Sequence, residues 1–213
     1  KNKMATRLEP YRDYSEHEVV NLFSLAVADN QDLRLWGPGD ALSGDQDAGV
    51  IVTADAAAAE LPGDIPGFSD KDAGGATTAL RKFLGASGQP HVGYNAYPVV
   101  GLNVKAAESG DAPLGITLKQ TLAYDENDEN LLRYPLKKDE LQAVLPGQAV
   151  PVLTRGLVLL NGLAFEGGAT PAVGEGLDLS ASDDGKFAAG GAGSLGKIIA
   201  SGAGGKFLCK ISF

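Results

Sequence analysis

Alternating apolar and polar positions dominate the end of the chain. In the last strand-like run Phe207, Cys209, Ile211 and Phe213 alternate with Lys206, Leu208, Lys210 and Ser212, and Ile199 precedes them across a glycine-rich turn. Successive side chains of a strand point to opposite faces, so the spacing predicts a terminal β-hairpin that buries Ile199 with the first set. Further short apolar runs between glycines predict more strands, at 149–162, 176–182 and 185–191.

These closely spaced strands are typical of a small barrel or sandwich. Upstream, the segments 91–107 and 115–126 read as two strands around a turn at 109–113. Residues 135–147 predict one or two helical turns ended by Pro146 and Gly147. We therefore expect a β domain over 89–213, with its compact part at 147–213.

The N-terminal region, residues 1–35, predicts an extended arm. Ser15 and Glu18 fit a capping box, yet the β-branched and aromatic run from Val19 to Val27 favours a strand. A polar lead followed by an apolar run suits an arm that packs on a neighbouring protein. It suits a first core strand equally well.

Residues 36–88 predict a loop-rich middle region. Glycine and proline alternate there with aspartate, which is typical of surface turns. Only residues 50–53 predict a strand, and Thr77 to Gly85 is the best candidate for a short helix. The fold class expected for the whole chain is mainly β, with an N-terminal arm and a loop-rich middle.

Composition narrows the function classes. The chain has 213 residues, 29 of them glycine, and a formal net charge of −9. Such an acidic balance argues against a surface that binds nucleic acid or acidic membranes. The sequence shows neither an apolar run of membrane-spanning length nor a signal-peptide core, so we expect synthesis in the cytoplasm. The single cysteine, Cys209, cannot form an intrachain disulfide and is expected in the core.

One motif suggests nucleotide chemistry at first sight. The heptapeptide GAGSLGK, Gly191 to Lys197, satisfies two phosphate-binding patterns, but Ile198 stands where a serine or threonine would bind magnesium. Strand-like residues follow instead of the helix whose N-terminus would hold a phosphate. A glycine-rich loop feeding the terminal hairpin is therefore the better interpretation.

Other candidate chemistry is also weak. The aspartates of the middle region and the acidic run from Asp125 to Asn130 lack the ligand spacing of a calcium loop, and solvated acidic turns explain them better. His17 and His91 have no motif around them, and no serine lies in a nucleophile elbow. We expect no catalytic, cofactor-binding or metal-binding residues, and no enzyme.

Two segments carry a resemblance to a known family. The opening "PYRDYSEHEVVNLFSL" resembles the N-termini of tailed-phage virion proteins. The segments "LPGQAVPVLTRGLVLLNG", "GEGLDLSASDDGKF" and "GKIIASGAGGKFLCKISF" resemble the compact β fold of phage capsid decoration proteins, also called cement or head-stabilising proteins. The glycine- and aspartate-rich middle departs from that pattern.

The resemblance implies a β-tulip-like C-terminal domain and a place on the outer capsid surface of a virion. It implies the major capsid protein as partner and self-association, as a homotrimer rather than a dimer, without nucleic acid, membrane or cofactor. The candidate contact residues lie in the N-terminal segment: Tyr11, Arg12, Tyr14, His17, Val19, Val20, Leu22 and Phe23.

A second function class remains open. Trp36, Tyr94 and Tyr97 could form stacking platforms of a module that recognises host glycans. Packing against loops or a subunit interface explains the same aromatic residues. Binding to isolated sugars would distinguish this class from a capsid-binding protein.

Overall fold

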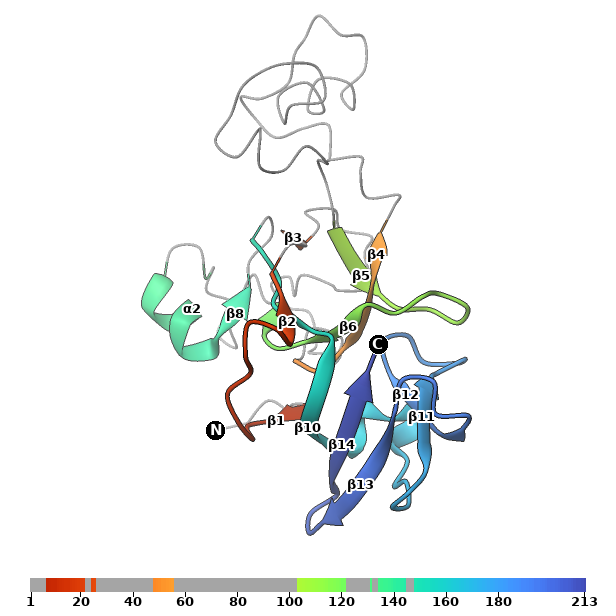
Figure 1. Ribbon diagram of the computed structural model, residues 1–213. Helices are drawn as coiled ribbons and strands as arrows, with labels where there is room; N and C mark the ends of the chain where they lie inside the picture. The colour runs from red at the N-terminus through yellow and green to blue at the C-terminus, as the bar shows by residue number, and fades with distance from the viewer. Residues whose placement is uncertain are drawn as a thin grey trace, which may run out of the picture.

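The part of the chain that the structure describes folds into two six-stranded β-sheets and one two-stranded sheet, with very little helix (Figure 1). The computed structural model describes residues 7–21, 24–25, 48–55, 103–121, 131, 134–144 and 148–213. The expected mainly β class is confirmed. The short helix expected at Thr77 to Gly85 lies outside the described residues, as do Trp36, Tyr94 and Tyr97.

The first sheet contains the C-terminal part of the chain and curls into a half-barrel (Figure 1). Its strand order is β1-β10-β14-β13-β11-β12, and every pairing is antiparallel. The strands are β1 (Leu8–Glu9), β10 (Arg155–Asn161), β11 (Gly176–Leu179), β12 (Phe187–Gly191), β13 (Gly196–Gly202) and β14 (Lys206–Ser212). Two short 3-10 turns, η3 (Gly162–Ala164) and η4 (Glu166–Gly168), follow β10.

The second sheet has the order β2-β9-β6-β4-β5-β3. Its strands are β2 (Val19–Val20), β3 (Ser24–Leu25), β4 (Ile51–Asp55), β5 (Asn103–Ala106), β6 (Gly115–Thr117) and β9 (Val152–Leu153). Both β5 and β6 pair with β4, which lies between them. In the described parts of the two segments expected around the turn at 109–113, β5 and β6 are strands, but they are not hydrogen-bonded to each other. Residues 91–102 and 122–126 of these segments lie outside the described residues.

One nearly continuous strand joins the two sheets. Thr154 alone separates β9 from β10. The N-terminal segment runs antiparallel to this strand twice, with β1 on β10 and β2 on β9. In the described part of the expected arm, the short strands thus pair with strands of the same chain.

The main core lies between the two sheets. Its largest fully buried side chains come from both of them, for example Ile51 and Leu153 from the second sheet and Leu160 and Phe187 from the first. Burying each such side chain stabilises the fold by about 1.5–3 kcal/mol. A second cluster of seven residues, including Val50 and Val52, packs on the other face of the second sheet. Neighbouring residues of β4 are buried in different clusters because successive side chains of a strand point to opposite faces.

The terminal hairpin confirms most of the expected alternation. Phe207, Cys209 and Ile211 are buried, and burial raises the pKa of the Cys209 thiol to about 12. Ile199 was placed on the wrong face: it is 40% exposed, and Ile198 is buried instead. The cause is a register shift between Ile198 and Ala200, because an extra residue in a strand reverses the alternation beyond it.

The one helix with described side chains is α2 (Pro135–Leu141), where a helix was expected. Proline suits its first turn because its N–H would have no partner there. The helix ends at Gln142, which adopts a left-handed conformation, earlier than the expected stop at Pro146 and Gly147. It leads into β8 (Ala143–Val144), which pairs in parallel with β7 (Gln120–Thr121).

Candidate functional site: the clamped N-terminal loop

The loop of residues 10–18 lies across the junction of β9 and β10, between β1 and β2. Its two ends are fixed by strand pairing: Glu9 lies opposite Leu159, and Val19 lies opposite Leu153. The nine residues between these two pairs therefore lie opposite only five residues of the partner strand, 154–158. The excess length forms a loop that stands out from the sheets.

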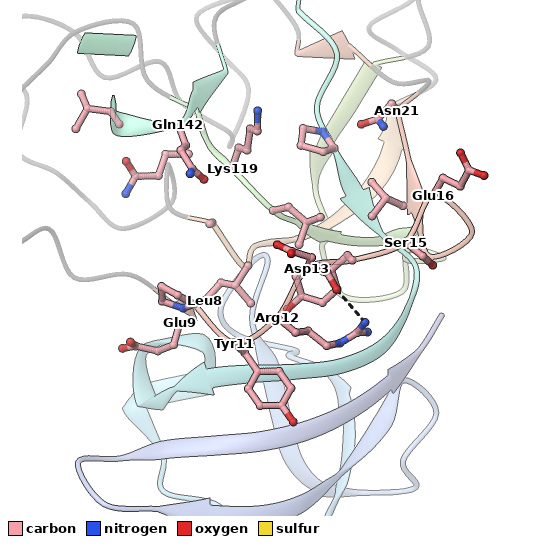
Figure 2. Close-up of a pocket in the computed structure, with 18 of the residues that line it drawn as sticks. Leu8, Glu9, Tyr11, Arg12, Asp13, Ser15, Glu16, Asn21, Lys119 and Gln142 are labelled. Carbon is pink, nitrogen blue, oxygen red and sulfur yellow. Dashed lines mark hydrogen bonds between the residues drawn. The ribbon is translucent and has the colours of Figure 1, made fainter. Parts of the chain in front are cut away.

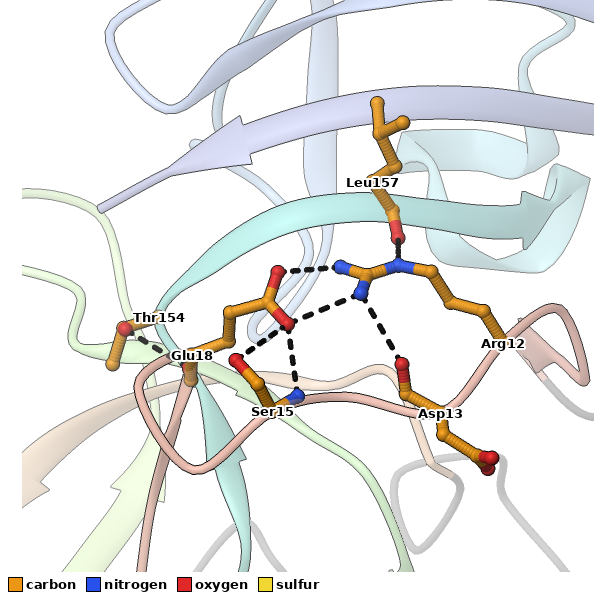
Figure 3. Close-up of polar contacts among 6 residues, drawn as sticks. All are labelled: Arg12, Asp13, Ser15, Glu18, Thr154 and Leu157. Carbon is orange, nitrogen blue, oxygen red and sulfur yellow. Dashed lines mark hydrogen bonds and ion pairs between the residues drawn. The ribbon is translucent and has the colours of Figure 1, made fainter.

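Arg12 and Glu18 hold this loop closed (Figure 3). The Arg12 guanidinium donates to both carboxylate oxygens of Glu18, at 2.6 and 3.1 Å, and its Nε donates to the carbonyl oxygen of Leu157 at 3.2 Å. The backbone oxygen of Glu18 accepts from the N–H and the hydroxyl of Thr154, at 2.8 and 3.1 Å. Two-pronged pairing of this kind fixes direction as well as distance, and the bonds to Leu157 and Thr154 tie the loop to β10 and to the residue that precedes it.

Ser15 completes the carboxylate's surroundings. Its N–H and its hydroxyl both donate to Glu18 Oε2, and its carbonyl oxygen accepts from the Glu18 N–H at 3.0 Å. Serine and glutamate at this spacing make half of a capping box. Here the motif closes one turn and the strand β2 follows it. The capping-box pattern and the strand-like run from Val19 therefore each predicted a feature of the structure.

The charges of the clamp respond to this pairing. Hydrogen bonds from Arg12, and next from the Ser15 backbone, lower the pKa of Glu18 to about 2. The bond to Glu18 raises the pKa of Arg12. The low pKa of Glu18 keeps its carboxylate charged at neutral pH, where it pairs with the Arg12 guanidinium.

Gly156 makes room for the clamp. It has φ +135, and a Cβ atom at this position would lie 2.6 Å from Arg12 Nη2 and 2.7 Å from Glu18 Oε1. That backbone conformation is essentially restricted to glycine. A glycine near the start of β10 thus suits this backbone conformation and leaves room for the ion pair beside it.

Tyr14 joins the loop to the main core. The Arg12 guanidinium lies 4.6 Å from the centre of its ring, within the range of a cation–π contact, and the ring packs against the core cluster. Desolvation raises the pKa of its phenol. Within the part of the chain that the structure describes, its buried hydroxyl has no hydrogen-bond partner.

A groove of about 1070 Å³ runs beside the loop (Figure 2). The loop and β1 form one wall, and residues near β7 and the end of α2 form the other. Its charged lining is mainly acidic, with Glu9, Asp13, Glu16 and Glu140 against Arg12 and Lys119. Arg12 is paired with Glu18 and Glu9 with Lys206. Asp13, Glu16 and Glu140 then stand against Lys119 alone, so the groove presents a negative surface.

The structure brings four of the predicted contact residues together on the loop: Tyr11, Arg12, Tyr14 and His17. Tyr11 is 47% exposed, and His17 is exposed on the turn before β2. Arg12 and Tyr14 instead hold the loop in place.

The other predicted contact residues lie further along the segment. Val19 packs against the main core and Val20 against the second cluster, so their own chain partly buries both. Leu22 and Phe23 lie outside the described residues. Sequence reasoning missed Thr154 and Gly156, because their roles depend on contacts with a segment far away in the chain.

The glycine-rich heptapeptide, 191–197, joins β12 to β13. The carboxylate of Asp178 accepts from the N–H groups of Gly193 and Ser194 and from the Ser194 hydroxyl, and these bonds lower its pKa. A Cβ on Gly191 would overlap the same carboxylate. The N–H groups that could have held a phosphate already bind an internal anion.

Within the described residues, three or more histidine, cysteine, aspartate or glutamate side chains nowhere gather as a metal site. None of the helices described is long and apolar enough to cross a membrane.

Comparison with known proteins gave no relatives. No protein-family model, no curated protein and no solved structure matches the chain.

Proposed function

We propose that the chain is a structural virion protein that binds the outside of a phage capsid and stabilises it. The resemblance of residues 10–25 to the N-termini of tailed-phage virion proteins, and of the last third to decoration proteins, supports this function. The β-tulip-like architecture, the outer-surface location and the homotrimeric state belong to the same proposal.

The observation that carries the proposal is the clamped loop at residues 10–18. Arg12 and Glu18 hold it in one conformation, and Tyr11 stands exposed at its start. Ordering a flexible loop costs free energy on binding, so a loop already fixed binds more tightly. Exposed tyrosines are common among the residues that dominate binding energy at protein interfaces.

The proposed partner is the major capsid protein. Tyr11 and His17 contact it directly, and Arg12 and Tyr14 position the loop. Val19 and Val20 pack within their own chain and contribute indirectly. The net charge of −9 suits an outer surface, away from packaged DNA that would repel it.

Co-sedimentation with purified phage heads that lack the protein tests this function. Tyr11→Ala should weaken attachment by about fivefold or more, the loss of about 1 kcal/mol that marks an important interface residue. Tyr134→Ala is the matched control, because Tyr134 is 48% exposed against 47% for Tyr11 but lies next to α2. It should sediment like the wild type.

Two outcomes contradict the proposal. A wild-type chain that stays in the supernatant is not a decoration protein, and binding to isolated sugars instead would favour the glycan-recognition class. If Tyr134→Ala weakens attachment and Tyr11→Ala does not, the contact lies at α2 and the loop has no part in it.

A further inference from the structure

The outward face of the first sheet is apolar in its centre and basic around it. Residues directly opposite each other in an antiparallel pair lie on the same face. Leu208 of β14 lies between Leu159 of β10 and Ala200 of β13, and it points away from the buried Phe207 and Cys209. Both leucines are only half-buried, so this row is open to a partner.

Four cations surround this row on the same strands: Arg155, Lys197, Lys206 and Lys210. Glu9 is the one acidic side chain that β1, β10, β13 and β14 contribute, and it is paired with Lys206 at 2.9 Å. In a chain of net charge −9, this face is locally positive.

Lys197 and Lys210 have an unfavourable arrangement within the chain. They lie directly opposite each other across β13 and β14, and both are exposed. Like charges at directly opposite positions destabilise a sheet. Among the described residues neither ammonium group has an ion-pair partner, so an acidic surface placed on this face would remove the repulsion.

The same chain carries such a surface. Asp13 and Glu16 are exposed on the clamped loop, and Glu140 lies across the groove from them. None of the three forms an ion pair within the described part of the chain. The loop holds two of these carboxylates in a fixed position, because Arg12 and Glu18 fix its backbone.

We propose that the outward face of β10, β14 and β13 docks onto the acidic loop and groove of a second copy of this chain. Lys197 and Lys210 of one copy then face Asp13 and Glu16 of the other, around an apolar centre at Leu159 and Leu208. The contact joins two different surfaces, so a closed ring or an open chain of copies can form from it. This inference stands without the proposed capsid function.

The size of the face sets the expected strength. Three strands of seven residues, at about 3.3 Å per residue and about 4.8 Å apart, make a flat area of about 330 Å². A stable interface buries about 800 Å² per partner, more than twice the area of this face, so the contact is a weak one. We therefore expect association that depends on concentration in the micromolar range.

Sedimentation velocity of the full chain at roughly 1–100 μM, a range that brackets micromolar dissociation constants, tests the contact. The wild type should associate at about 0.1 M salt and dissociate at about 1 M, where the Debye length falls from about 10 to about 3 Å. Lys197→Glu with Lys210→Glu should weaken association at low salt by about tenfold or more. Lys138→Glu, on α2 and outside the lining of the groove, is the charge-change control and should leave it unchanged.

A charge swap identifies the partner surface. The double variant Asp13→Lys with Glu16→Lys should not associate by itself. Mixed with the double variant Lys197→Glu with Lys210→Glu, it should associate again. Circular dichroism checks that each variant is folded. A wild type that stays monomeric at the highest concentration overturns the proposal, as does association unaffected by reversal of the two lysines.

A mixture that fails to associate overturns the pairing of the two surfaces. Attachment to phage heads is measured separately, so a monomeric wild type that still binds heads leaves the proposed function standing. A chain that associates with itself but does not bind phage heads contradicts the proposed function and leaves the proposed contact between copies standing.

Discussion

Replacement of Gly156 by alanine is the sharpest test of the clamp. The new methyl group would meet Arg12 Nη2 at 2.6 Å and Glu18 Oε1 at 2.7 Å, closer than such atoms approach in proteins. The backbone at φ +135 is strained for alanine by itself, at a cost of about 1–3 kcal/mol. For a chain of this length each kcal/mol lowers Tm by about 2–4 °C, so the backbone cost of about 1–3 kcal/mol alone predicts a fall of about 2–12 °C.

A matched glycine separates the strain from the contact. Gly190 lies in β12 with φ +90 and has nothing within 4 Å of its Cβ position. Gly190→Ala should therefore show only the backbone cost, and thermal unfolding of Gly156→Ala should fall clearly below it. Equal losses in the two variants would refute the reasoning that the clamp needs this glycine.

A second measurement shows whether the methyl group acts through Arg12. If it displaces the guanidinium, Arg12→Ala should add little to the loss already caused by Gly156→Ala, because neighbouring residues that act together are not additive. Additive losses from the two changes would mean that the glycine and the arginine act independently.

Three further predictions concern other parts of the fold. The pKa of Glu18 is lowered to about 2 from an ordinary 4.5, which stabilises the fold above pH 4.5, and this stabilisation is lost as the pH falls towards 2. The Tm difference between the wild type and Glu18→Gln should therefore shrink between pH 4.5 and pH 2. A constant difference would contradict the clamp. Asp178→Ala should lower Tm, because it leaves the N–H groups of the glycine-rich loop without their acceptor. Calorimetry should find no micromolar binding of ATP with magnesium to the wild type. Tight binding of ATP would reverse our interpretation of the heptapeptide. Ile211→Lys should give insoluble or unfolded protein, because an unpaired buried charge costs several kcal/mol and the free energy of unfolding of a whole domain is only about 5–15 kcal/mol. Lys210→Glu, on the exposed face, should give a wild-type circular dichroism spectrum. A folded Ile211→Lys variant would remove the main support for a core strand at the C-terminus.

Local pattern predicted local structure well. The terminal hairpin, the strand at β4 and the helix at α2 all lie where alternation, glycine turns and proline placement put them. The burial of Cys209 and Ile211 also followed from a period of two. Ile199 shows the limit of this reasoning, because a single-residue register shift in β13 places it on the opposite face.

Predictions about the candidate site were less complete. Tyr11, Arg12, Tyr14 and His17 were proposed together from one short segment, and they do share one loop. Their separate roles could not be read from that segment. Whether a side chain is presented to a partner or holds the loop depends on β10, which is far away in the sequence.

The sequence by itself determined that this protein is mainly β, acidic and closed by a C-terminal hairpin, because periodicity, charge and turn residues act over a few neighbours. Only the tertiary structure decided that β4 separates β5 from β6 and that the carboxylate of Asp178 fills the glycine-rich loop. It also decided that Gly156 lies beside the ion pair of Arg12 and Glu18, although more than a hundred residues separate them along the chain. Each of these features joins segments that are distant in sequence, and the order in which strands pack is set by burial of the whole core and not by any local pattern.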